Sequence, residues 1–163
     1  MSSSVNETLR GFYIENRQRL YTYAVSIIHH REAAEDAIHH AFQQLLRRDN
    51  LPIDLRPYVF RCVRNSALDS LRRTKTRGES IFDESVELGT QDSGSNGLLS
   101  VAELNQWLEM LSDDERETVV LKIFDAFSFQ EIADLRRVPL STATSWYRRG
   151  LAKLRTMVAQ EKL

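Results

Sequence analysis

The chain has 163 residues, 42% hydrophobic and 28% charged, with a formal net charge of -1. This length holds one ordinary domain or two small ones, and the composition is that of a folded, soluble protein. The only cysteine, Cys62, excludes an intramolecular disulfide and a cysteine metal cluster, and no apolar run is long enough to insert in a membrane. Because the N-terminus has no signal peptide, we expect a cytoplasmic protein. We also expect no metal and no cofactor.

Apolar residues recur at helical spacing through the N-terminal half. Residues 9–28 place Leu20, Ala24, Ile27 and Ile28 on one face. Residues 33–47 carry a longer stripe of Ala34, Ala37, Ile38, Ala41, Phe42, Leu45 and Leu46. A third helix starts near Pro57, with an apolar stripe of Val59, Cys62, Val63, Ala67 and Leu71. Without convincing strand alternation, residues 1–77 are predicted to form a small helical domain.

The segment 56–77 concentrates positive charge that the whole chain lacks. It holds seven lysines and arginines against one acid, Asp69, and interleaves Tyr58, Phe60 and Asn65 among them. Cations suit phosphate, while aromatic and amide groups suit exposed bases. The pattern favours nucleic-acid binding over a merely solvated helix face.

Residues 78–99 differ from the segments on either side. They contain glycine, serine and acidic residues but no lysine or arginine, with QDSGSNG at the centre. This composition is typical of a flexible acidic linker.

The remaining segment, 100–163, is again helical in pattern. Ser112 with Glu115, and Ser128 with Glu131, have the spacing of capping boxes that start two helices. The core is expected to contain Trp107, Val119, Ile123, Phe124 and Phe127. After a break at 138–140, Ser141 is expected to cap a last helix running to about residue 159, which completes a helix-turn-helix.

The last helix has two different faces. The face expected to pack on the preceding helix consists of Ala143, Tyr147, Gly150, Leu151 and Leu154. The other presents hydroxyl and guanidinium groups that can bond to base edges and phosphates, from Ser141, Thr144, Ser145, Arg148 and Arg149. Six cations and no acid lie within 136–155, so we predict a second nucleic-acid surface, for duplex DNA.

Two motifs in this order resemble the bacterial RNA polymerase sigma factors of the extracytoplasmic-function (ECF) class. The first is LYTYAVSIIHHREAAEDAIHHAFQQLL followed by RPYVFRCVRNSALDSLRRTKTR, and the second is LEMLSDDERETVVLKIFDAFSFQEIADLRRVPLSTATSWYRRGLAKLR. The resemblance implies an all-α protein of two small helical domains joined by a flexible acidic linker. It divides the chain into a region-2-like domain (1–77), a linker (78–99) and a region-4-like domain (100–163).

The resemblance also implies partners and roles. Region 2 would bind core RNA polymerase and open the −10 promoter element, and region 4 would read the −35 element as duplex DNA. The polymerase-binding residues would be Asp36, His40, Gln43 and Arg47, which share a polar face opposite the apolar stripe. Single-stranded −10 DNA would be contacted by Tyr58, Phe60, Arg61, Arg64, Asn65, Arg72 and Arg73. The −35 residues would be those of the polar face of the last helix. An anti-sigma factor is a candidate further partner.

Three departures from the family pattern bear on these expectations. His39-His40 stands where the family usually has Gln-Glu, and Thr144 and Trp146 replace positions that are often basic. Arg137 replaces the usual turn glycine, so the turn must hold a non-glycine residue in strained or altered geometry.

Two other classes of function compete with the sigma-factor interpretation. One is a free-standing helix-turn-helix regulator that binds duplex DNA without polymerase, which would leave the basic, aromatic segment 56–77 without a purpose. The other is an enzyme that uses the histidine pairs, but adjacent histidines on a helix diverge by about 100° and cannot easily share an ion. No nucleophile–base spacing or phosphate-binding glycine loop is present, so no catalytic residues are expected.

Overall fold

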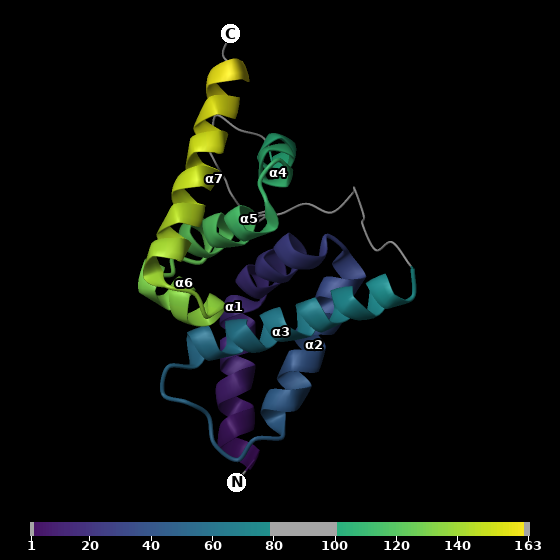
Figure 1. Cartoon of the computed structure of the whole chain (residues 1–163). Coiled ribbons are helices and arrows are strands. Elements are labelled where there is room, and N and C mark those ends of the chain that lie inside the picture. Colours follow the sequence, from purple (N-terminus) through teal and green to yellow (C-terminus); the bar gives the residue numbers. More distant parts are fainter. Residues whose placement is uncertain (1, 79–100, 162–163) are drawn as a thin grey trace. The chain divides into compact units, whose positions relative to one another are not determined.

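The computed structural model describes residues 2–78 and 101–161, and every regular element in these two ranges is a helix (Figure 1). The all-α prediction is therefore confirmed. The chain divides into two compact units, Met1–Val86 and Glu87–Leu163, each with its own core. Apart from Gly78, the linker predicted at 78–99 lies outside the described residues. Within them, no helix combines the length and apolar character that crossing a bilayer requires.

The first unit consists of three mutually packed helices, α1 (Ser2–Ile28), α2 (Arg31–Leu46) and α3 (Leu55–Thr76), with α3 crossing the other two (Figure 1). The predicted stripes form its core because each lies on one side of its helix. Most of their residues are buried, whereas Ile27, Phe42, Cys62 and Leu71 are half-buried and Leu46 is exposed. The largest fully buried side chains of this core include Leu20, Tyr23, Leu45 and Phe60.

A histidine pair forms the junction between α1 and α2. His29 ends α1 with a left-handed backbone (φ 58°), and the Nδ1 atom of His30 accepts a hydrogen bond from the Ala33 backbone N–H at 3.1 Å. His30 thus caps α2 by satisfying one of the backbone donors that the first turn leaves without a partner. Sequence reasoning missed this role, because serine, threonine, aspartate and asparagine are the usual caps.

The second unit contains α4 (Val101–Glu109), α5 (Asp113–Val119), the π-helical turn η1 (Val120–Phe124), α6 (Phe129–Arg136) and α7 (Leu140–Glu161). Both predicted capping boxes are present, at Ser112–Glu115 and Ser128–Glu131. The helix-turn-helix is α6, the residues 137–139 and α7, which is the longest helix of this unit (Figure 1). As the sequence predicted, Arg137 has altered geometry: its backbone is left-handed, at φ 55° and ψ 48°.

Three local expectations for this unit are wrong. Helix α7 begins at Leu140, so Ser141 lies within the first turn and does not cap it. Gly150 permits a close approach to α5 rather than to α6, since a Cβ there would lie 3.0 Å from Cγ2 of Val119. Ile123 is 51% exposed and Phe124 is only half-buried. The latter two lie in η1, where the π-helical turn changes the face that each position presents.

Candidate polymerase and nucleic-acid interfaces

The polar face of α2 is accessible along its whole length. Asp36, His40, Gln43 and Arg47 are all exposed, opposite the buried stripe that fixes the helix in the first unit. His40 is held along the helix by a 3.1 Å hydrogen bond between its Nε2 and the side-chain nitrogen of Gln44. The face therefore offers charges of both signs on a rigid support, which suits a protein partner better than phosphate. Its role in polymerase binding stays a prediction.

Four of the predicted −10 residues line up on one face of α3. Tyr58, Arg61, Asn65 and Arg72 are three, four and seven positions apart, so they lie one above another. Asn65 and Arg72 are exposed, and Tyr58 and Arg61 are half-buried. Arg64 and Arg73 lie on either side of this row. The row places ring, amide and cationic groups side by side, as binding of single-stranded DNA requires.

Two neighbouring side chains modify this row. Arg48 lies over the Tyr58 ring, with its Cζ 5.2 Å from the ring centroid. Arg72 pairs with Asp69 at 3.2 Å, but both side chains are well exposed, so the pair adds little to stability. A phosphate can therefore replace Asp69 as the partner of Arg72 at small cost.

Phe60 does not belong to this surface. Its side chain is 0% exposed, and its ring centroid lies 5.5 Å from that of Tyr23 in the core. The sequence prediction counted aromatic residues among the charges without separating the faces of the helix. Because Phe60 shares the buried face with Val59, Val63 and Ala67, it cannot stack on a base in this structure. It is a core residue.

The predicted −35 residues lie together on α7. Ser141, Ser145, Arg148 and Arg149 are exposed, and Thr144 is half-buried. The Thr144 hydroxyl donates back to its own helix, with the Leu140 and Ser141 carbonyls 3.1 and 3.0 Å away, which leaves its lone pairs as acceptors. Donors and acceptors thus share one face of a helix that is free on that side.

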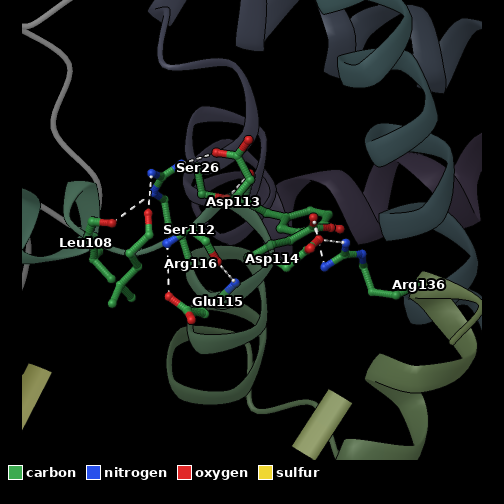
Figure 2. A network of polar contacts seen from close by, with 11 residues as sticks. Ser26, Leu108, Ser112, Asp113, Asp114, Glu115, Arg116 and Arg136 are labelled. Atoms are coloured by element: carbon green, nitrogen blue, oxygen red, sulfur yellow. Dashed lines mark hydrogen bonds and ion pairs between the residues drawn. The ribbon is translucent and has the colours of Figure 1, made fainter. Parts of the chain in front are cut away.

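The positive charge near α7 is smaller than the sequence suggests, because acidic residues of α5 neutralise part of it. Arg136 has a side chain only 6% exposed and pairs with Asp114 at 2.5 Å (Figure 2). It also pairs with Glu117 at 3.2 Å. Lys153 pairs with Glu115 at 2.6 Å. Arg136 and Lys153 are therefore paired within the unit, although Lys153 is itself exposed, as are Arg137, Arg148 and Arg155.

A second buried arginine organises the start of α5. Arg116 donates from Nε to the Leu108 carbonyl at 2.9 Å, from Nη2 to the Leu111 carbonyl at 3.1 Å, and from Nη1 to Asp113 at 3.1 Å. Figure 2 shows Arg116 between Leu108 and Asp113. Leu108 and Leu111 lie at and just beyond the end of α4, where carbonyls lack partners within the helix. Arg116 therefore fixes α4 to α5, a role that no local spacing signals.

Two groups have shifted pKa values. Burial raises the pKa of the Cys62 thiol, although the nearby Arg48 and Arg61 and a hydrogen bond with Tyr58 act in the opposite direction. Burial also acts to raise the pKa of Glu115, but Lys153 and Ser112 outweigh it and lower the pKa of that carboxyl below its ordinary value. The described residues contain no group of three or more histidines, cysteines or acids placed to hold a metal.

Comparisons with known proteins match both units. A model of sigma-70 region 2 matches residues 12–77, and a model of sigma-70 region 4 matches residues 102–154, which together account for most of the chain. No curated protein sequence gives a match.

Two solved structures share the fold. The sigma factor RpoE from Bartonella quintana, solved with the anti-sigma factor NepR, is 22% identical with a TM-score of 0.77, over 94% of this chain and 98% of that one. CnrH, solved with the cytosolic domain of CnrY, is 18% identical with a TM-score of 0.66, over 98% of this chain and 92% of that one.

Two helical units, the second carrying a helix-turn-helix with an exposed polar and basic face, define a DNA-binding transcription factor. With region 2 and region 4 in this order, the chain belongs to the sigma-70 family of bacterial RNA polymerase sigma factors, in its ECF class. Core RNA polymerase and promoter DNA are the partners that this membership assigns to it.

Proposed function

We propose that this chain is a promoter-specificity subunit, which binds core RNA polymerase and directs transcription initiation by recognising and opening −10 and −35 promoter DNA. Residues 1–77 serve polymerase and the −10 element, residues 100–163 serve the −35 element, and 78–99 connect them. The observation that carries the proposal is the row of Tyr58, Arg61, Asn65 and Arg72 on one accessible face of α3. A regulator that binds only duplex DNA has no need of such a surface.

Polymerase binding is assigned to the polar face of α2. Replacing Asp36 with arginine reverses one charge on that face without touching the buried stripe. The matched control is Glu15→Arg, which reverses an exposed charge on α1. Association with core RNA polymerase is measured at two ionic strengths, because charge pairs at an interface rim act mainly through association rate and salt dependence.

We expect Asp36→Arg to weaken the association and Glu15→Arg to leave it unchanged, with helical content equal in both. If the unmodified protein does not associate with polymerase at either ionic strength, the proposed function fails, and a free-standing regulator takes its place. If Asp36→Arg associates normally, only the position of the interface is wrong.

Opening of the −10 element is assigned to the α3 row. Asn65→Ala is expected to reduce opening of duplex promoter templates more than it reduces binding of the −35 duplex, since its amide would contact unpaired bases. Asn6→Ala removes an exposed amide from α1 and serves as the control. Equal losses in both assays with the fold intact would contradict this division of roles.

We also propose that a protein of the anti-sigma class binds this chain. In the two solved structures, NepR is bound to RpoE and the cytosolic domain of CnrY is bound to CnrH. Such a partner would compete with core polymerase. The test is to purify the chain from its own cells, identify proteins present in equal amounts with it, and measure whether core polymerase displaces them.

A further inference from the structure

One carboxylate in the second unit serves both the start of a helix and the charge of the DNA-reading helix. Glu115 is 5% exposed. Its Oε1 accepts from the Ser112 backbone N–H at 3.0 Å, which completes the capping box of α5. The same oxygen accepts from Lys153 Nζ at 2.6 Å, and Oε2 lies 3.9 Å from Arg149 Nε. Two cations of α7 are therefore directed to one buried acid.

Arg149 lies at the edge of the exposed polar face of α7, and Lys153 lies beside it, just outside that face. Lys153 follows Arg149 by four residues, about one helical turn, so the two side chains lie one above the other. Their side chains are 46% and 61% exposed, respectively. Both can reach a phosphate beside the helix, but Lys153 must first leave Glu115.

The pairing affects how tightly the helix binds DNA of any sequence. Each phosphate that a protein neutralises releases counterions and steepens the dependence of log K on log salt by about 0.9. Cations that contact phosphate strengthen binding to every sequence alike, so they add affinity without adding discrimination. When an internal acid pairs with such a cation, the cation no longer contacts phosphate and non-specific binding becomes weaker. The contacts to base edges are unchanged.

We propose that Glu115 is a specificity-determining residue. By pairing with Lys153 and lying close to Arg149, it keeps these cations from DNA phosphates, so that α7 binds non-specific duplex DNA weakly. This role rests on the proposed use of α7 as the duplex-reading helix. Glu115 acts through the two cations and contacts no DNA itself.

The chain contains a matched control for the decisive substitution. Glu115→Gln removes the charge but keeps an oxygen for the capping box, which accepts glutamine as well as glutamate. Glu131 occupies the same place in the capping box of α6, with 2.9 Å from the Ser128 N–H to its Oε1. Among the described residues, the side chain of Glu131 forms its hydrogen bond within that box and takes part in no ion pair. Glu131→Gln therefore repeats the chemical change without releasing a cation.

The experiment measures binding of the full chain to a labelled random-sequence duplex over a series of salt concentrations. Glu115→Gln is expected to bind more tightly than the unmodified protein and to show a slope steeper by about 0.9, so that its advantage shrinks roughly 3.5-fold between about 50 and 200 mM salt. Glu131→Gln is expected to match the unmodified protein. Lys153→Met alone is expected to give the same slope as the unmodified protein. Combined with Glu115→Gln, it is expected to abolish the steeper slope of that variant.

Two results would overturn the proposal: a Glu115→Gln slope equal to that of the unmodified protein, or a flatter slope when Lys153→Met is made alone. The assay needs neither polymerase nor a promoter. A failure of the proposed function in polymerase assays is thereby distinguished from a failure of this role for Glu115.

Discussion

The guanidinium of Arg136, at the end of α6, lies over the indole ring of Trp146 in α7, with Cζ 4.7 Å from the ring centroid. The same group pairs with Asp114 and Glu117 of α5. Its Nη1 is close enough to Glu117 for an ion pair, at 3.2 Å, but is not aligned for a hydrogen bond. One side chain thus joins both helices of the helix-turn-helix to the helix behind them.

Arg136→Met is expected to destabilise the second unit, because it removes the cation that pairs with the buried carboxylate of Glu117, whose side chain is 7% exposed. Breaking a buried pair in this way costs about 3–5 kcal/mol. The measurement is denaturant unfolding followed by helical content, with the exposed Arg155→Met as the control. A loss no larger than that of the control would show that the pair has no structural role.

Phe60 and Tyr58 are two positions apart on α3 but should respond differently to truncation. Phe60→Ala empties a fully buried site and is expected to lower the free energy of unfolding by about 3–5 kcal/mol. Tyr58→Ala should leave the fold stable and weaken binding of a single-stranded −10 oligonucleotide by about 1–3 kcal/mol, the usual contribution of one stacked base. If Tyr58→Ala unfolds the unit, or leaves oligonucleotide binding unchanged, its assignment to the −10 surface is wrong.

Replacing Arg137 tests the backbone of the helix-turn-helix turn. A left-handed conformation costs an L-residue about 1–2 kcal/mol, and glycine avoids this cost. Glycine also gives the unfolded chain more conformational entropy, which lowers the free energy of unfolding by about 0.4–1 kcal/mol and offsets part of the gain. Arg137→Gly is therefore expected to raise the free energy of unfolding by roughly 0.5–1 kcal/mol. Arg137→Ala removes the same charge and keeps the strain, so it should give no gain. Equal stabilisation by both changes would point to charge repulsion as the cause.

The lowered pKa of Glu115 predicts how stability depends on pH. Because the folded pKa lies below that of the unfolded chain, the ionised carboxylate stabilises the fold fully above the ordinary value of 4.5. That contribution is lost as the pH falls through the folded pKa. The thermal midpoint of the unmodified protein should therefore fall more steeply in acid than that of Glu115→Gln, whereas parallel curves would contradict the pKa shift.

The helices and both capping boxes could be predicted because they depend on residues three or four positions apart. The exposed polar faces of α2 and α7 followed from the same periodicity. The burial of Phe60 could not be seen by counting residue types, since it depends on which face of α3 meets Tyr23. The neutralised cations were missed because their acids are distant: 22 residues separate Arg136 from Asp114, and 38 separate Lys153 from Glu115. Local spacing carries no information about such pairs.

The left-handed residues between helices have a consequence for how accurately α7 is presented. His29, Ala126 and Arg137 adopt positive φ values of 58°, 56° and 55°, and none is glycine. A Cβ at such a position leaves a small allowed region of backbone angles, whereas glycine would allow a broad one. The turn at Arg137 therefore acts as a stiff joint with a narrow angular range. Under the proposed function, α7 on this joint would approach the groove of DNA within a narrow range of inclinations, and less orientational freedom would be lost on binding.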